Sequence, residues 1–221
     1  MSVNCIRLGD VDVIPVYSAK NLGTWFDSHM DMQTHITKTC GSAFFLYDIR
    51  HIRKYLTSEC TEKLIDAFTT SRLDYCNSLL YGVPDLHMQK LQRVMNASAR
   101  LIFCAPKHCH ITPLLQQRHW LPMRLRIEFK ILFITFKILR GSAPKYRIDL
   151  ISVLPPSRYD LRRNNKGILL STPKRFTKVT MRPCHAGSIL HGVSIRSAGT
   201  ISDFKQKLKA FLFSKAFCYY N

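Results

Sequence analysis

Four side chains that can bind a metal ion crowd into one short stretch, at Cys104, His108, Cys109 and His110. A structural zinc site needs ligands that surround the ion as a tetrahedron, and such sites usually show a doubled Cys-x-x-Cys pattern or its histidine variant. Three of these four residues are adjacent in the sequence instead, and the remaining cysteines are scattered along the chain. We therefore interpret them as packing and loop residues, and we predict no metal site.

Two further groups could do chemistry. Asp10 and Asp12 lie two positions apart, so on a strand they would share a face and could hold a magnesium ion. A functional magnesium site needs more anionic ligands than two, which favours a solvated hairpin turn. His119 beside Trp120 could stack on a base or transfer a proton, but no Ser, Cys or carboxylate partner is placed by the sequence, so we favour packing. We predict no catalytic residue and no cofactor.

Positive charge is the dominant chemical feature of the chain. Its 33 Lys and Arg residues against 14 Asp and Glu residues give a formal net charge of +19. A compact body with that excess repels itself unless a polyanion neutralises it, and nucleic acid is the partner that we predict first. An anionic membrane surface is the alternative, although the longest apolar run, Ile131 to Phe136, is too short to span a bilayer.

The basic residues recur in groups that lack nearby acids. Arg126, Lys130, Lys137 and Arg140 share one narrow stripe on the helix predicted from Pro122 to Arg140. A further group in the loop-rich segment contains Arg162, Arg163, Lys174 and Arg175. A series of cationic faces can follow a phosphate backbone with salt-dependent affinity, whereas a solvated helix face is the alternative. The residues predicted to bind nucleic acid are Arg50, Arg53, Lys54, Lys90, Arg93, Arg100, Arg126, Lys130, Lys137, Arg140, Arg162 and Arg163.

The elements that would position these residues are mainly helices. Residues 3 to 26 contain β-branched and aromatic positions broken by Gly9-Asp10, which predicts a hairpin and a third short strand. Ser28 and Asp31 resemble a capping box at the first helix start. Helices are predicted from Ser28 to about Tyr55, Ser58 to about Leu79, Pro84 to about Phe103, Pro122 to Arg140, Tyr146 to Ile151 and Ser202 to Phe217. The fold class is therefore mainly α with a small N-terminal β element (α+β).

Eight stretches of the sequence match one known family in the family's order. They are NLGTWFD (21–27), HIRKYL (51–56), SRLDYCNSLLYG (71–82), LQRVMNASARLI (91–102), HITPLL (110–115), HWLP (119–122), APKY (143–146) and FKQKLK (204–209). Together they resemble the C-terminal part of the reverse transcriptase of non-LTR, jockey-like LINE retrotransposons, at the point where the palm passes into the thumb.

The resemblance implies a domain organisation and a partner. Residues 1–27 would be the end of the palm, with a primer-grip-like strand that includes Leu22, Gly23, Trp25 and Phe26. Residues 28–154 would form a helical thumb and connection bundle, 155–200 a basic loop-rich segment and 201–221 a C-terminal amphipathic helix. RNA or an RNA–DNA hybrid would be the ligand.

Two departures from the family limit what the resemblance implies. Its polymerases hold two magnesium ions on palm carboxylates that include an Asp-Asp pair, and this sequence has no such pair. We therefore expect the chain to begin downstream of that motif, to lack the family's endonuclease, and to be no enzyme by itself; magnesium and the missing palm and endonuclease portions belong to the parent polyprotein. Arg182 to Val193 also replaces a Gly-Pro-x-Leu-Trp-Asn-x-Leu-Pro stretch, as in decay or a shifted reading frame, which leaves its packing open.

These observations predict a fragment of a retrotransposon RNA-directed DNA polymerase that binds RNA or DNA backbone through basic helix faces, without the polymerase active site. The alternative is a retrotransposon relic that has no function or that acts as a protein-interaction module. A peripheral membrane binder is a third, weaker hypothesis because only charge supports it. The N-terminal residues show no secretory pattern, so we expect an intracellular location, nuclear or cytoplasmic, and cysteines in the thiol form.

Overall fold

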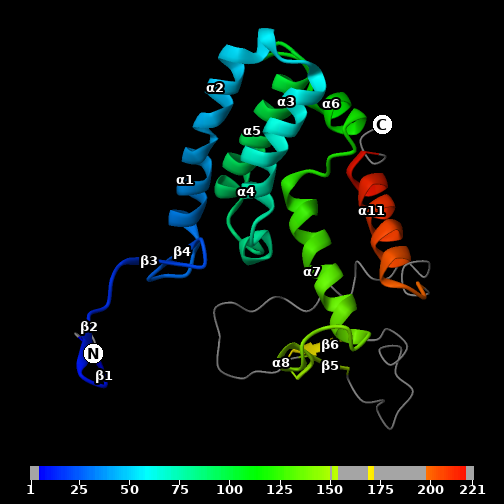
Figure 1. The fold of residues 1–221 in the computed structure, drawn as a ribbon. Coiled ribbons are helices and arrows are strands. Elements are labelled where there is room, and N and C mark those ends of the chain that lie inside the picture. The colour runs from blue at the N-terminus through cyan, green and yellow to red at the C-terminus, as the bar shows by residue number, and fades with distance from the viewer. Residues whose placement is uncertain (1–4, 150, 154–168, 172–197, 218–221) are drawn as a thin grey trace. The chain divides into compact units, whose positions relative to one another are not determined.

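The computed structural model describes residues 5–149, 151–153, 169–171 and 198–217 (Figure 1). The chain divides into two compact units, Met1–Leu114 and Leu115–Asn221, and each is described separately. Helices account for 65% of the described residues and strands form a small element at the N-terminus. The predicted α+β class, mainly helical, is therefore confirmed.

The N-terminal strands form two antiparallel hairpins, so the prediction of one hairpin and a single third strand was wrong. The missing strand is Ser18–Asn21, whose residues are too polar for β-propensity to reveal. A two-residue turn at Leu22 and Gly23, with φ of 46° and 83°, folds this strand back onto its partner. The pairs are β1 (Ile6–Leu8) with β2 (Val11–Val13), and β3 (Ser18–Asn21) with β4 (Thr24–Asp27).

The side chain of Asp27 joins the second hairpin to the first helix, α1 (Gln33–Gly41). Its buried carboxylate accepts hydrogen bonds from the backbone N–H groups of Asp31 at 3.0 Å and Thr34 at 3.4 Å. Burial raises the pKa of Asp27, but the hydrogen bonds outweigh it and leave this pKa below its ordinary value. The predicted capping box at Ser28 was therefore wrong, because Asp27 supplies the acceptor and the helix begins later.

The helix predicted from Ser28 to Tyr55 is broken by short 3₁₀ turns. After α1 come a 3₁₀ turn (Ser42–Phe44), α2 (Phe45–Ile52) and a second 3₁₀ turn (Arg53–Tyr55). Tighter 3₁₀ turns rotate the side chains relative to an uninterrupted α-helix. As a result Phe44 and Ile52 are exposed, whereas Ile49 is buried.

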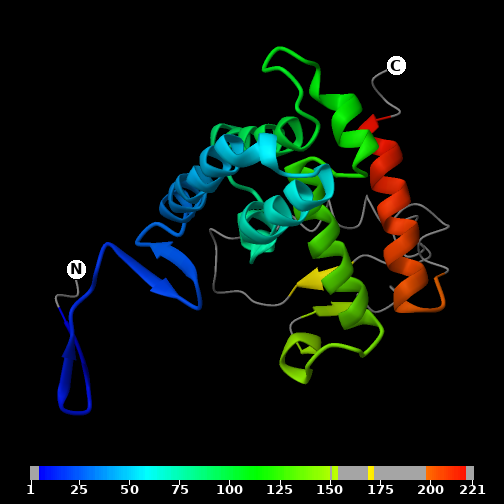
Figure 2. The ribbon, with the colours of Figure 1, turned by 45° about the horizontal axis from the view of Figure 1, so that its top comes forward.

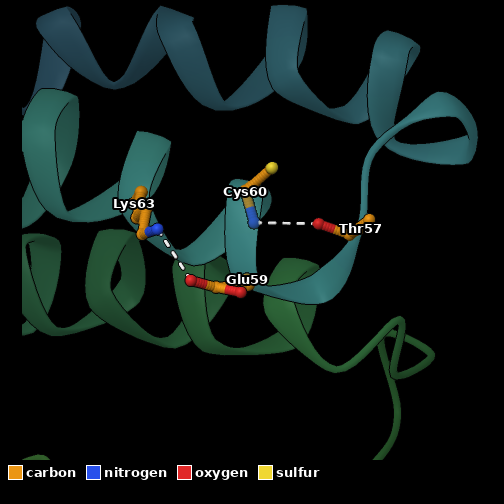
Figure 3. Close-up of polar contacts among 4 residues, drawn as sticks. All are labelled: Thr57, Glu59, Cys60 and Lys63. Atoms are coloured by element: carbon orange, nitrogen blue, oxygen red, sulfur yellow. Dashed lines mark hydrogen bonds and ion pairs between the residues drawn. The ribbon is translucent and has the colours of Figure 1, made fainter.

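The next helix, α3 (Ser58–Ile65), begins where the sequence predicted (Figure 3). Thr57 caps it, because its Oγ1 accepts a hydrogen bond from the Cys60 N–H at 3.2 Å. An exposed Glu59–Lys63 pair at 2.7 Å spans its first turns. The chain then continues through a π-helical turn (Asp66–Thr70), α4 (Ser71–Asp74) and a 3₁₀ turn (Asn77–Leu80).

The core of the first unit forms around α5 (Asp85–Ile102), which confirms the helix predicted there. It packs against α1, α2 and α3 (Figure 1). Each fully buried aliphatic side chain contributes about 1.5–3 kcal/mol relative to an exposed one. The largest buried contributors are Ile36, Ile49, Ile65, Leu91, Met95 and Ile102. A short helix that we did not predict, α6 (Ile111–Gln117), follows.

The second unit is built on two helices that lie side by side, α7 (Met123–Leu139) and α11 (Ile201–Phe217) (Figures 1 and 2). Both confirm predicted helices. Their core includes Phe136 and Phe204, whose parallel rings lie 3.7 Å apart between centroids. Further elements are α8 (Lys145–Ile148) and an antiparallel pair, β5 (Ile151–Val153) and β6 (Leu169–Ser171). Most of the predicted loop-rich segment, including Arg182 to Val193, lies outside the described residues.

Candidate nucleic-acid interface

Cationic side chains from α2 and α5 line one groove in the first unit, which we call the α2–α5 groove. Its volume is about 620 Å³. Three of the predicted nucleic-acid-binding residues, Arg50, Arg53 and Arg100, meet there, although two separate stretches of sequence supply them. The groove residues are Leu46, Tyr47, Arg50, Arg53, Ala97, Arg100, Leu101, Cys104, Ala105 and Lys107. None of these residues is acidic, so the groove is suited to an anion.

Two more predicted residues lie along the same face of α5. Residues three or four positions apart on a helix are neighbours, so Lys90 and Arg93 continue the line of Ala97 and Arg100. Arg93 is exposed and Lys90 is half-buried. Burial raises the pKa of the nearby Cys40 thiol, and the Lys90 charge lowers it by less, so this pKa is raised overall. From Lys90 to Arg100 the cations extend over about 15 Å of helix.

Arg53 binds the end of α5. Its Nε donates to the Leu101 carbonyl at 3.1 Å, its Nη2 to the Ile102 carbonyl at 3.0 Å, and its Nη1 to the Leu56 carbonyl at 2.8 Å. The last carbonyls of a helix lack partners within the helix and lie at the negative end of its dipole, so a guanidinium there is favourable. Arg53 therefore holds α2 and α5 together and fixes the groove.

The other groove cations make fewer hydrogen bonds than Arg53. Arg100 donates from Nη2 to the Cys109 carbonyl at 3.1 Å, and its shielded Nε has no hydrogen-bond partner. Arg50 and Lys107 are exposed, and within the described part of the chain neither forms an ion pair. Lys54 is also exposed, with its Nζ 4.8 Å from the ring centroid of Tyr55. Arg50 and Lys107 can thus turn toward a ligand without breaking a contact.

The predicted stripe on α7 (Arg126, Lys130, Lys137 and Arg140), here the α7 stripe, is used differently. The Arg126 guanidinium lies 5.3 Å from the Trp120 ring centroid and donates from Nε to the Leu121 carbonyl at 2.9 Å. Arg140 lies 5.3 Å from the Phe136 ring and donates to the Ala198 carbonyl. The Lys137 Nζ is 4.8 Å from the Phe133 ring. Among the described residues, Lys130 is the one member of this stripe that is exposed and forms no hydrogen bond, ion pair or ring contact.

The primer-grip-like residues sit on the second hairpin. Leu22 and Gly23 form its turn, and the Tyr75 hydroxyl donates to the Leu22 carbonyl. Trp25 and Phe26 are half-buried on β4. The backbone N–H of Trp25 donates to His35 Nδ1 at 3.4 Å, and burial lowers the pKa of His35. An 84% exposed leucine at a positive φ is an unfavourable turn residue, and strain of that kind gathers at binding sites.

The remaining candidate groups do not assemble into a site. Asp10 lies in the β1–β2 turn and Asp12 on β2, and His119 packs 5.5 Å from the Phe213 ring. In residues 5–149, 151–153, 169–171 and 198–217, no three His, Cys, Asp or Glu side chains lie close enough to hold a metal ion. Arg162, Arg163, Lys174 and Arg175 lie outside the described residues. Across the described helices, none has the length and apolarity to cross a membrane.

Sequence reasoning missed two groove residues, Tyr47 and Lys107. Tyr47 lies three positions before Arg50, and this spacing on a helix was the available signal. Lys107 follows α5 in an irregular loop, where no periodicity applies. Compared with models of protein families, with curated proteins and with solved structures, the chain has no match.

Proposed function

We propose that this chain is the thumb and connection portion of a non-LTR retrotransposon RNA-directed DNA polymerase and that it binds the backbone of RNA or an RNA–DNA hybrid. The observation that supports the proposal best is the α2–α5 groove, where basic residues from two separate stretches meet and no lining residue is acidic. Phosphate binding by such a groove requires charge and position but no base-specific contact.

The proposal assigns binding and no bond chemistry to this chain. The sequence contains no Asp-Asp pair that could hold two magnesium ions. Nucleotide transfer would depend on a palm portion of the parent polyprotein, which is the proposed protein partner. The hairpin with Leu22, Gly23, Trp25 and Phe26 would then lie at the primer side, where its exposed turn could touch a strand.

The test is binding of the full chain to a fluorescent RNA–DNA hybrid over a salt series. We expect affinity to fall at least tenfold from about 50 to about 200 mM salt, with a slope that reflects the number of phosphates contacted. The double variant R50Q/K107Q should reduce the slope of log K against log salt concentration by roughly 1 to 2. Each lost phosphate contact removes about 0.7–0.9 from that slope. K63Q is the matched control, because Lys63 is an exposed lysine on α3 outside the groove.

Two results would contradict the proposal. Absent or salt-independent binding of the wild type would exclude a backbone-binding function. Equal slopes for R50Q/K107Q and K63Q would exclude the α2–α5 groove as the binding surface.

A relic or a protein-interaction module is the second candidate. The altered stretch from Arg182 to Val193 favours it, because a local break between matching flanks is typical of decay. Reading the nucleotide sequence upstream of Met1 distinguishes the two: an in-frame palm with its carboxylates supports the polymerase portion, and stop codons support the relic.

A further inference from the structure

Three aromatic side chains form a continuous row along the outside of the first 3₁₀ turn and α2. They are Phe44, Tyr47 and His51, here called the aromatic row. The Phe44 and Tyr47 rings are stacked with centroids 6.0 Å apart, and the Tyr47 and His51 rings meet edge to face at 4.3 Å. Spacings of three and four residues keep the rings on one side of the helix.

The row is open although most of its surface is apolar. Phe44 is 66% exposed and Tyr47 is 58% exposed, and His51 is exposed as well. Tyr55, four residues after His51, is 78% exposed. Single exposed apolar residues are ordinary, but a contiguous apolar patch marks a surface that binds something. The row therefore calls for an occupant with flat apolar faces.

Charge decides which occupant fits. The same helical segment carries two cations, Arg50 and Lys54, and one acid, Asp48, so its charge is net positive. Tyr47 itself lines the α2–α5 groove beside Arg50, Arg53 and Arg100. Tyr47 thus belongs to both the row and the groove, with cations beside it. An occupant needs an anionic backbone and planar groups at the same time.

We infer that the aromatic row is a stacking platform for the unpaired bases of a single-stranded nucleic acid whose phosphates lie in the α2–α5 groove. Aromatic side chains beside a cationic groove bind single strands in this way, because every base has a face on which a ring can stack. In a duplex those faces are covered by neighbouring base pairs. The inference rests on the proposed function, and it adds that the ligand is single-stranded where it meets α2.

The experiment compares two strands with the same charge. The full chain is titrated with a 12-nucleotide oligothymidine and with an abasic strand of equal length, which keeps the phosphates but lacks bases. We expect the wild type to bind oligothymidine at least tenfold more tightly than the abasic strand, since stacking contributes about a factor of ten per base. The variant F44L/Y47L, which keeps only the His51 ring of the row, should lose most of this preference and keep its salt dependence.

Matched controls separate stacking from unfolding. Y146L removes an exposed tyrosine that also lies beside an arginine, Arg147, but is outside the row, so it should keep the preference for bases. Both substituted rings in F44L/Y47L are exposed, and its thermal unfolding midpoint should match that of the wild type. A second measurement on the wild type, the binding of a 12-base-pair duplex, should show weaker affinity than the single strand.

The possible outcomes are distinct. Equal binding of the base-containing and abasic strands by the wild type would overturn the stacking platform and leave the backbone proposal standing. No binding of either strand would overturn both. Self-association of the wild type in sedimentation, abolished in F44L/Y47L, together with equal binding of the two strands, would assign the row to a second copy of the chain and also overturn the inference.

Discussion

The α2–α5 groove and the α7 stripe contain the same basic residue types, Arg and Lys, yet they use their charges in different ways. In the groove, Arg53 is bound to helix-end carbonyls while Arg50 and Lys107 remain exposed beside it. On α7, Arg126, Lys137 and Arg140 each lie over an aromatic ring. A basic stripe in a sequence therefore predicts where cations are, and the residues around it decide whether they are available.

The largest effect is expected at Arg53, where one guanidinium makes three hydrogen bonds to carbonyls. R53A should destabilise the first unit by about 3 kcal/mol, because charged hydrogen bonds contribute about 1.5–3 kcal/mol and their loss leaves carbonyls without donors. Trp25 reports this unit by fluorescence during urea unfolding when Trp120 is replaced by Phe. R50A is the control, and an equal loss in R50A would show that the groove cations have one shared role.

A smaller loss of stability is expected on α7. R140A removes a hydrogen bond to the Ala198 carbonyl and a cation–π contact with Phe136, so it should destabilise the second unit by about 1–2 kcal/mol. Trp120 reports that unit in a W25F background. The salt dependence of hybrid binding should be unchanged. If R140A instead makes the salt dependence shallower without loss of stability, Arg140 contacts the ligand and its charge is available for binding.

The parts of the fold that the sequence predicted are those with long apolar periodicity. The bounds of α5, α7 and α11 follow from it to within about two residues. Strand β3 has no such pattern, and its pairing is set by the turn at Leu22 and Gly23. Helix α6 has only seven residues and includes Pro113, so periodicity is too short to indicate it.

For the candidate site, the sequence predicted the basic residues but not the contacts that they make. Local sequence identified Arg50, Arg53 and Arg100, but the partner of Arg53 is a carbonyl 48 residues away at Leu101. Such a contact depends on how α2 and α5 pack, and a residue pattern within one helix holds no information about it. The exposure of Phe44 likewise depends on the break in the predicted helix, because a 3₁₀ turn rotates its side chain relative to an uninterrupted α-helix.

Acid should destabilise the first unit through His35. Burial lowers the pKa of His35 below its ordinary value of 6.5, and its Nδ1 must stay unprotonated to accept the Trp25 N–H. The unfolded chain then binds a proton more readily than the folded one, so the stability of the first unit is complete above pH 6.5 and declines as the pH falls below it.

Urea unfolding followed by Trp25 between pH 7 and pH 5 measures this decline. H35Q keeps an acceptor but cannot be protonated there, so its unfolding free energy should depend less on pH than that of the wild type. Identical pH dependence in H35Q and the wild type would assign the effect to other groups. An equal decline at Trp120 would show that the units respond to acid together.

Lys130 gives the smallest and most discriminating test of the comparison. It is the member of the α7 stripe whose ammonium group is exposed without a contact among the described residues, so K130Q should change stability by less than about 0.5 kcal/mol. If the second unit takes no part in binding, K130Q should leave the salt slope for the hybrid equal to that of K63Q. A slope reduced by about 0.7–0.9 would mean that Lys130 contacts a phosphate. Lys130 would then supply the available charge of α7, while Arg126, Lys137 and Arg140 stay held over aromatic rings.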